Sequence, residues 1–232
     1  MRVAIITGAS QGIGAGLVAG FRGAGYAVVG NSRSIGSVEE ADYLTVEGDI
    51  TDAETAQRVV DRALERFGRI DSVINNAGIF IGKRFTDYTA EEYAAITAVN
   101  LAGFFHMTQA TIRHMVTRGT GHVVNITTSI VDRPSSRRPS ALVALTKGGL
   151  AAVTRSLAIE YASHGIRVNA VAPGIIQTPM HEAASYEGVA ALHPLGRLGT
   201  VDDVVDAILY LERATFVTGE VLHIDGGQAA GR

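Results

Sequence analysis

Residues 2–14, RVAIITGASQGIG, join a short apolar run to a loop that contains three glycines. The run is rich in β-branched residues and is typical of a buried strand, and apolar residues at helical spacing follow the loop. The backbone N–H groups at the start of a helix have no partner and carry partial positive charge, so they stabilise an anion. Glycines let the chain turn sharply and let a phosphate approach the backbone. The segment therefore predicts a phosphate-binding strand–loop–helix unit, although its Gly-x-x-x-Gly-x-Gly spacing also fits an ordinary strand–helix turn.

Length and composition indicate a single globular domain. The chain has 232 residues, of which 47% are hydrophobic and 19% charged, with a net charge of −3. This balance gives no electrostatic footprint for nucleic acid or for an anionic membrane. No cysteine is present, which excludes disulfides and thiolate chemistry, and no metal site is expected. Because the first strand starts next to Met1 and no apolar run approaches about 20 residues, we expect no signal peptide, no membrane span and a cytoplasmic location.

Strand and helix patterns alternate along the whole chain. Strands are expected at 2–6, 26–30, 43–46, 71–75, 121–126, 166–171 and 220–224. Helices are expected after the glycine loop and at 52–67, 90–118, 140–163 and 201–211. Residues 31–42 are too few for a full crossover helix, and residues 175–200 are expected to form a loop region with one short helix at most. Alternating strands and helices predict an α/β fold with a parallel sheet covered on both faces.

Five motifs follow in order at strand ends and on the next helices. After the glycine loop come Asn-Asn-Ala-Gly at 75–78, Asn100, Ser129, Lys147 and the Pro-Gly-x-x-x-Thr segment at 173–178. This set resembles the short-chain dehydrogenase/reductase (SDR) family, and the resemblance covers essentially the whole chain. It implies one NAD(P)-binding domain over residues 1–232 with a doubly wound, seven-stranded Rossmann sheet. It also implies a variable substrate lid at about 179–200 and a homo-oligomer, a tetramer or a dimer.

The resemblance also assigns roles to individual residues. Asn100, Ser129 and Lys147 would be catalytic, Lys147 would hold the nicotinamide ribose, and Asp49 would accept from the adenine amino group. Thr178 would bond the nicotinamide carboxamide. The other implied cofactor contacts are Gly8, Ser10, Gln11, Gly12, Ile13, Gly14, Ile50, Asn76, Ala77, Gly78, Pro173, Gly174 and Ile176. Asn76 and its neighbours could also serve to tie strands together.

The end of the second strand favours NADP(H) over NAD(H). An acidic residue there would accept from the ribose 2′-OH of NAD and repel a 2′-phosphate. This chain instead has Asn31, Ser32, Arg33 and Ser34. An arginine can form a charge-assisted fork with a phosphate, and serine hydroxyls can donate to it.

The proton donor of the family is missing from its place. In the family a Tyr four residues before the Lys transfers the substrate proton, and the Lys lowers the pKa of that Tyr. Here Val143 stands four residues before Lys147, and no Tyr occurs between Tyr93 and Tyr161. The segment between Ser129 and Val143 is also slightly longer than usual, so Thr128 could replace Ser129 as the hydroxyl.

Three accounts of the missing tyrosine remain open. Another group could supply the proton, and Tyr186, His181 and His193 are candidates, although each is more often an ordinary surface residue. Ser129, or water held by Asn100 and Lys147, could deliver it more slowly. Alternatively, the protein binds a nucleotide with little or no dehydrogenase activity, as a sensor or an inactive subunit.

The sequence thus predicts an NADP(H)-dependent oxidoreductase that interconverts a carbonyl and an alcohol on a small molecule. Arg133, Arg137 and Arg138 lie between Ser129 and Lys147 and could recognise a carboxylate or phosphate of the substrate. A solvated loop is the simpler interpretation of these three arginines.

Overall fold

A computed structural model of the chain describes residues 1–136, 138–179 and 186–231, with the backbone alone for residues 186 and 187. Its centre is a seven-stranded sheet in the order β3-β2-β1-β4-β5-β6-β7, in which every neighbouring pair is parallel. The strands are β1 (Arg2–Thr7), β2 (Tyr26–Ser32), β3 (Tyr43–Glu47), β4 (Ser72–Asn75), β5 (Gly121–Ile126), β6 (Ile166–Pro173) and β7 (Val221–Ile224). The predicted doubly wound α/β fold is confirmed.

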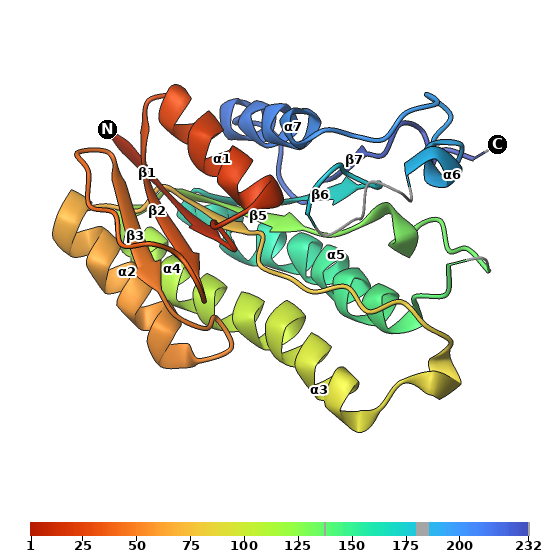
Figure 1. Ribbon diagram of the computed structural model, residues 1–232. Coiled ribbons are helices and arrows are strands. Elements are labelled where there is room, and N and C mark those ends of the chain that lie inside the picture. The colour runs from red at the N-terminus through yellow and green to blue at the C-terminus, as the bar shows by residue number, and fades with distance from the viewer. Residues whose placement is uncertain (137, 180–185, 232) are drawn as a thin grey trace.

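Helices cover both faces of the sheet (Figure 1). The helices are α1 (Gly12–Gly23), α2 (Ala53–Phe67), α3 (Ala90–Thr97), α4 (Phe104–Arg118), α5 (Ala141–Tyr161), α6 (Tyr186–Ala190) and α7 (Val201–Arg213). Helices α1 and α7 pack on one face, and α2, α4 and α5 pack on the other. Side chains alternate accordingly along β1, where Val3 and Ile5 enter one core and Ala4 and Ile6 the other.

Local signals account for several boundaries. Helix α2 begins after Asp52, whose carboxylate accepts from the N–H of Glu54 at 3.0 Å, and it ends at Gly68 in the left-handed conformation. The connection between β2 and β3 has no helix, in agreement with the expectation that residues 31–42 are too few for a full crossover helix. Strand β5 has the expected bounds, and the other strands differ from expectation by one or two residues; the largest differences are β2, which runs to Ser32, and β6, which runs to Pro173.

The helix expected at 90–118 is wrong as a single helix. It consists of α3, a π-helical segment at Ala98–Gly103 and α4. A π-helical turn is often found at functional sites. This one contains Asn100, one of the predicted catalytic residues.

One segment bears on the expectation that no part of the chain spans a membrane. Residues Ala141–His164, helix α5 with the turn Ala162–His164, are long and apolar enough to cross a membrane by length and composition. In the structure the inner side of α5 packs against β5 and β6, with Leu150, Thr154 and Ala158 buried. The segment is therefore placed as a core helix of the fold.

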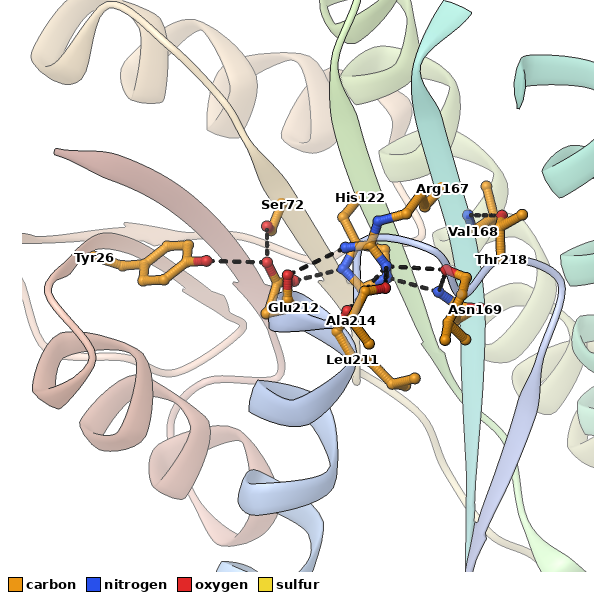
Figure 2. Close-up of polar contacts among 11 residues, drawn as sticks. Tyr26, Ser72, His122, Arg167, Val168, Asn169, Leu211, Glu212, Ala214 and Thr218 are labelled. Carbon is orange, nitrogen blue, oxygen red and sulfur yellow. Dashed lines mark hydrogen bonds and ion pairs between the residues drawn. The ribbon is translucent and has the colours of Figure 1, made fainter. Parts of the chain in front are cut away.

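The amino ends of the strands are closed by a buried polar network (Figure 2). The Glu212 carboxylate on α7 accepts from Tyr26 Oη at 3.1 Å and from Ser72 Oγ at 2.8 Å, and it lies 2.7 Å from Nδ1 of His122. Nε2 of His122 faces Nδ2 of Asn169 at 3.0 Å, so Nδ1 carries the proton that faces Glu212. Arg167 adds a positive charge and donates to carbonyl oxygens at the end of α7.

Candidate functional site

The carboxyl ends of the strands border a cavity of about 330 Å³. It opens where the strand order reverses, beside β1 and β4, which is the usual ligand position on an open parallel sheet. The predicted residues that line this cavity are Gly8, Ser10, Gln11, Gly12, Ile13, Ser32, Arg33, Asp49, Ile50, Asn76, Ala77, Gly78, Ser129, Lys147, Pro173, Gly174, Ile176 and Thr178. Gly14 and Asn100 are the two predicted site residues that do not line it.

The glycine loop forms a cradle suited to a phosphate. Gly8 and Gly12 have φ angles of +66° and +54°, a region that side-chain-bearing residues rarely adopt. Gln11 precedes α1 without a side-chain cap, and the first turn of α1 contains no acidic residue. The free N–H groups of that turn are thus available to an anion. These features fit the pyrophosphate of a dinucleotide.

Gly14 packs closely against the backbone of the glycine loop. A Cβ at this position would lie 2.0 Å from the carbonyl oxygen of Gly8, which no real contact permits. The absence of a side chain at Gly14 therefore allows α1 to pack on the loop, and its expected role as a cofactor contact stays a prediction.

The carboxyl ends of β2 and β3 present polar groups that could bind the adenosine end of a dinucleotide. The hydroxyls of Ser10 and Ser32 lie 3.0 Å apart, and Arg33 beside them is exposed. Asp49 accepts from the N–H of Thr51 at 2.9 Å, and this bond holds the pKa of Asp49 below its usual value. Asp49 is therefore an ionised acceptor on the cavity wall.

The Asn-Asn-Ala-Gly motif ties β1 to β4 at the edge of the cavity. Nδ2 of Asn76 donates to the carbonyl of Thr7 at 2.8 Å. The Thr7 hydroxyl accepts from the N–H groups of Asn76 and Ala77 at 3.0 and 2.9 Å. Ala77 and Gly78 reach the cavity from this anchored turn.

Asn100 lies behind the wall of the cavity, next to Val99, which lines it. Its Oδ1 accepts from the N–H of Ile79 at 2.9 Å, and its Nδ2 donates to the carbonyl of Ile79 at 3.1 Å and to the Thr146 hydroxyl at 3.2 Å. Both amide hydrogens are thus engaged by protein groups. In this structure Asn100 fixes the chain after β4 against α5, and its expected catalytic role stays a prediction.

Lys147 is buried on α5, and its Nζ donates to the carbonyl of Ile126 at 2.8 Å. Burial lowers the pKa of Lys147 to about 8. Val143, one turn earlier, also lines the cavity and packs with Ile96 and Leu142. A hydrocarbon side chain therefore stands one helical turn from the lysine.

Ser129 follows β5 in a short 3₁₀ turn and is almost fully buried. Its hydroxyl donates to Oε1 of Gln228 at 3.0 Å. Gln228 lines the cavity too, and sequence reasoning did not identify it because no motif marks the segment after β7. Thr128, the alternative hydroxyl, lines the same wall and accepts from the N–H of Ile130 at 3.4 Å.

The three alternative proton donors fare differently. His193 is buried outside the cavity lining, and its Nε2 accepts from the N–H of Ile175 at 3.1 Å. It supports the backbone beside Gly174, and donating a proton from Nε2 would break this bond. His181 lies outside the described residues, as does the side chain of Tyr186.

Two of the three arginines reach the cavity. Arg133 and Arg138 line its wall, whereas Arg137 lies outside the described residues. The neighbouring carboxylate of Asp132 lies 3.0 Å from Nε2 of His223. Within the described part of the chain, neither guanidinium forms an ion pair.

A phosphate cradle at a topological switch point, followed by a buried lysine and serine in one cavity, defines a dinucleotide-binding α/β protein with a polar reaction site. Residues 8–229 match the family described as enoyl-(acyl carrier protein) reductase. The chain belongs to the short-chain dehydrogenase/reductase family of oxidoreductases.

Relatives of similar length support this membership. The chain is 38% identical to a Streptomyces violaceoruber protein assigned as ketoacyl reductase 2 of the granaticin polyketide synthase, covering 97% of this chain and 95% of the relative. It is 33% identical to the 3-oxoacyl-[acyl-carrier-protein] reductase FabG of Escherichia coli K12, covering 97% and 96%.

Two solved structures are also similar to this chain in fold and in sequence. ElxO with NADP bound superposes with a TM-score of 0.91 at 30% identity and 99% coverage of both chains. The 3-ketoacyl-(acyl-carrier-protein) reductase of Brucella melitensis, in complex with NADH, has a TM-score of 0.89 at 32% identity and 98% coverage of both chains.

Proposed function

We propose that this protein is an NADP(H)-dependent oxidoreductase that interconverts a carbonyl and an alcohol. The observation that carries the proposal is one cavity that joins the glycine cradle to Lys147 and Ser129. When bound, the nicotinamide cofactor supplies a hydride to the carbonyl carbon. The residues of the chain then have to orient the carbonyl and provide the proton that its oxygen takes up.

The preference for NADP(H) rests on the end of β2. Arg33 and the paired hydroxyls of Ser10 and Ser32 offer donors to a 2′-phosphate. No carboxylate stands at residues 31–34 to repel it. Solved relatives bound to NADP and to NADH show that both cofactors occur among similar structures, so this local chemistry decides the proposal.

The proposed proton source is Lys147, acting through water. Val143 has no proton to give, whereas Lys147 lines the same cavity and carries an ammonium group. Its pKa of about 8 leaves it protonated at neutral pH yet able to release the proton. Solvent returns a proton to Lys147 after each turnover.

The proposed substrate is a carbonyl compound that carries an anionic group. Arg133 and Arg138 support this class, because two cations without an ion-pair partner in the described residues line the same cavity. Relatives named as 3-oxoacyl-[acyl-carrier-protein] reductases suggest 3-oxoacyl thioesters as the first compounds to test. Pro179 and Leu192 also line the cavity, which supports a substrate lid at about 179–200.

We also propose a cytoplasmic homo-oligomer, a dimer or a tetramer. Phe105 on α4 and Leu145 and Ile159 on α5 are large apolar side chains that the chain leaves largely exposed. They lie on helices that cover the same face of the sheet. Light scattering after size-exclusion chromatography tests this, with Ile159→Glu expected to shift the protein towards a smaller species.

The test of the function combines binding and turnover. Titration with NADPH and NADH should show tighter binding of NADPH, and NADPH absorbance should fall with 3-oxoacyl thioesters or other carbonyl compounds. Val143→Tyr should change the rate little. The second candidate function, supported by Val143 in place of the tyrosine, is a nucleotide-binding family member that has lost its proton relay. This function would hold if the wild type binds NADPH without turnover while Val143→Tyr reduces a carbonyl. Failure to bind either cofactor would overturn both.

A further inference from the structure

The segment after β7 places a carboxamide on the serine of the site. Oε1 of Gln228 accepts from the Ser129 hydroxyl at 3.0 Å across a separation of 99 residues. Both side chains line the cavity that contains Lys147 and the glycine cradle. Gln228 is therefore a polar side chain of the reaction site that comes from outside every recognised motif.

A tight turn holds Gln228 in this position. The buried carboxylate of Asp225 accepts from the N–H groups of Gly227 and Ala229 at 2.9 and 2.7 Å, on either side of Gln228. The N–H of Gln228 itself donates to the carbonyl of Asp225 at 3.1 Å. Gly226 and Gly227 adopt φ angles of +59° and +89°, which the turn requires. The backbone of Gln228 is thus fixed before any ligand binds.

This contact leaves Ser129 without a proton to donate to a ligand. A serine hydroxyl has one proton, and Ser129 gives it to Gln228, so Ser129 is left as an acceptor. A carbonyl oxygen needs donors. The carboxamide of Gln228 has two N–H donors on the nitrogen beside Oε1, with no protein partner in the described residues. The group that can donate next to Ser129 is therefore the amide of Gln228.

We propose that Gln228 positions the substrate: its Oε1 holds the Ser129 hydroxyl while its Nε2 donates a hydrogen bond to the substrate's carbonyl oxygen. This inference rests on the carbonyl reduction proposed above. Negative charge develops on that oxygen as the hydride arrives, and a fixed donor stabilises it. Gln228 thereby supplies one hydrogen bond at a site whose helix carries Val143 in place of a phenol.

The test compares Gln228→Met and Gln228→Glu with wild type. Methionine keeps the length and loses both hydrogen bonds, so kcat/KM should fall by about 100-fold, mainly in kcat, with NADPH affinity unchanged. Glutamate donates only when protonated, so Gln228→Glu should be impaired at pH 7 and should recover as the pH falls towards 5. Gln57→Met, on the exposed side of α2, is the matched control and should behave as wild type.

The outcomes separate this inference from the function on which it rests. Wild-type turnover with Gln228→Met within twofold of it, or a Gln228→Glu pH profile that follows wild type, would overturn the role of Gln228 and leave the function standing. A wild type that binds NADPH and reduces no carbonyl would overturn the function and the role of Gln228 together. An equal loss of NADPH affinity and of turnover in Gln228→Met would show a structural role and overturn the inference.

Discussion

The two ends of the same sheet are both polar, but their polar groups are used in opposite ways. At the amino ends, Tyr26, Ser72, His122 and Asn169 satisfy one another around Glu212 (Figure 2). At the carboxyl ends, among the residues that the structure describes, the first turn of α1 has no side-chain cap, and the buried Lys147 has a carbonyl as its partner and no carboxylate.

This difference shows how to separate stability from function in the molecule. A buried polar group whose partners are all protein atoms makes the native state specific, and removing one partner leaves the others unpaired. A donor that faces a cavity is available to a ligand and contributes less to stability. Mutations at the two ends should therefore have separable effects on unfolding and on activity.

The largest effect is expected from Lys147→Met at the open end. Loss of the proton source should lower turnover by about 10²–10⁴-fold. The free energy of unfolding should change little, because the variant removes a cation that burial already disfavours. Steady-state rates and urea unfolding measure the two quantities. Turnover in Lys147→Met close to that of wild type would exclude Lys147 as the proton source, and Lys147→Arg is the control for charge alone.

Glu212→Ala at the closed end should show the opposite pattern. It leaves His122, Tyr26 and Ser72 without their shared carboxylate, and breaking a buried charged contact of this kind costs about 3–5 kcal/mol of stability. Urea unfolding should show this loss, whereas folded protein should keep its NADPH affinity. A loss below about 1 kcal/mol would contradict the importance of the network. Glu65→Ala on exposed α2 is the control.

Arg33→Ala tests the far end of the cavity. Loss of one charge-assisted contact to a phosphate should weaken NADPH binding by about 10-fold or more and leave NADH binding unchanged. Fluorescence titration with both cofactors measures the ratio. Equal effects on the two cofactors would show that Arg33 does not contact a 2′-phosphate.

The smallest effect is expected from pH. Burial lowers the pKa of His122 and of His114 below the ordinary 6.5, so the unfolded chain binds more protons than the native state just below that pH. Stability should therefore be fully present above about pH 6.5 and fall as the pH drops below it, by about 1 kcal/mol per unit for each histidine. Thermal unfolding between pH 5 and 8 should show this slope, and His122→Gln should reduce it; an unchanged slope would assign it to His114.

Patterns that are local in the sequence predicted most of the fold. The glycine loop, the Asp52 cap and the alternation of strands and helices depend on neighbouring residues, and the structure agrees with them. Predictions failed where distant residues decide the outcome. The helix through Asn100 changes to a π-helical turn where that side chain bonds Ile79 and Thr146.

In the candidate site, too, sequence motifs identified some residues, and contacts between distant residues decided others. The motifs identified residues of the glycine loop and of the strand ends that line the cavity, whereas no motif identified Gln228, because its contact with Ser129 spans 99 residues. His193 could be any histidine in a loop until the structure shows Nε2 accepting from Ile175. The network around Glu212 left no sequence signal, since Tyr26 and Glu212 are 186 residues apart.

That last separation has a consequence for folding on the ribosome. Tyr26, Ser72 and His122 belong to the first half of the chain or lie just beyond it, but the carboxylate that joins them arrives with α7, near the C-terminus. Until α7 is synthesised, His122 and Tyr26 lack the buried acceptor they need, and contacts over such distances form slowly. Nascent chains that end before residue 201 should therefore remain sensitive to protease, and chains that include α7 should become resistant.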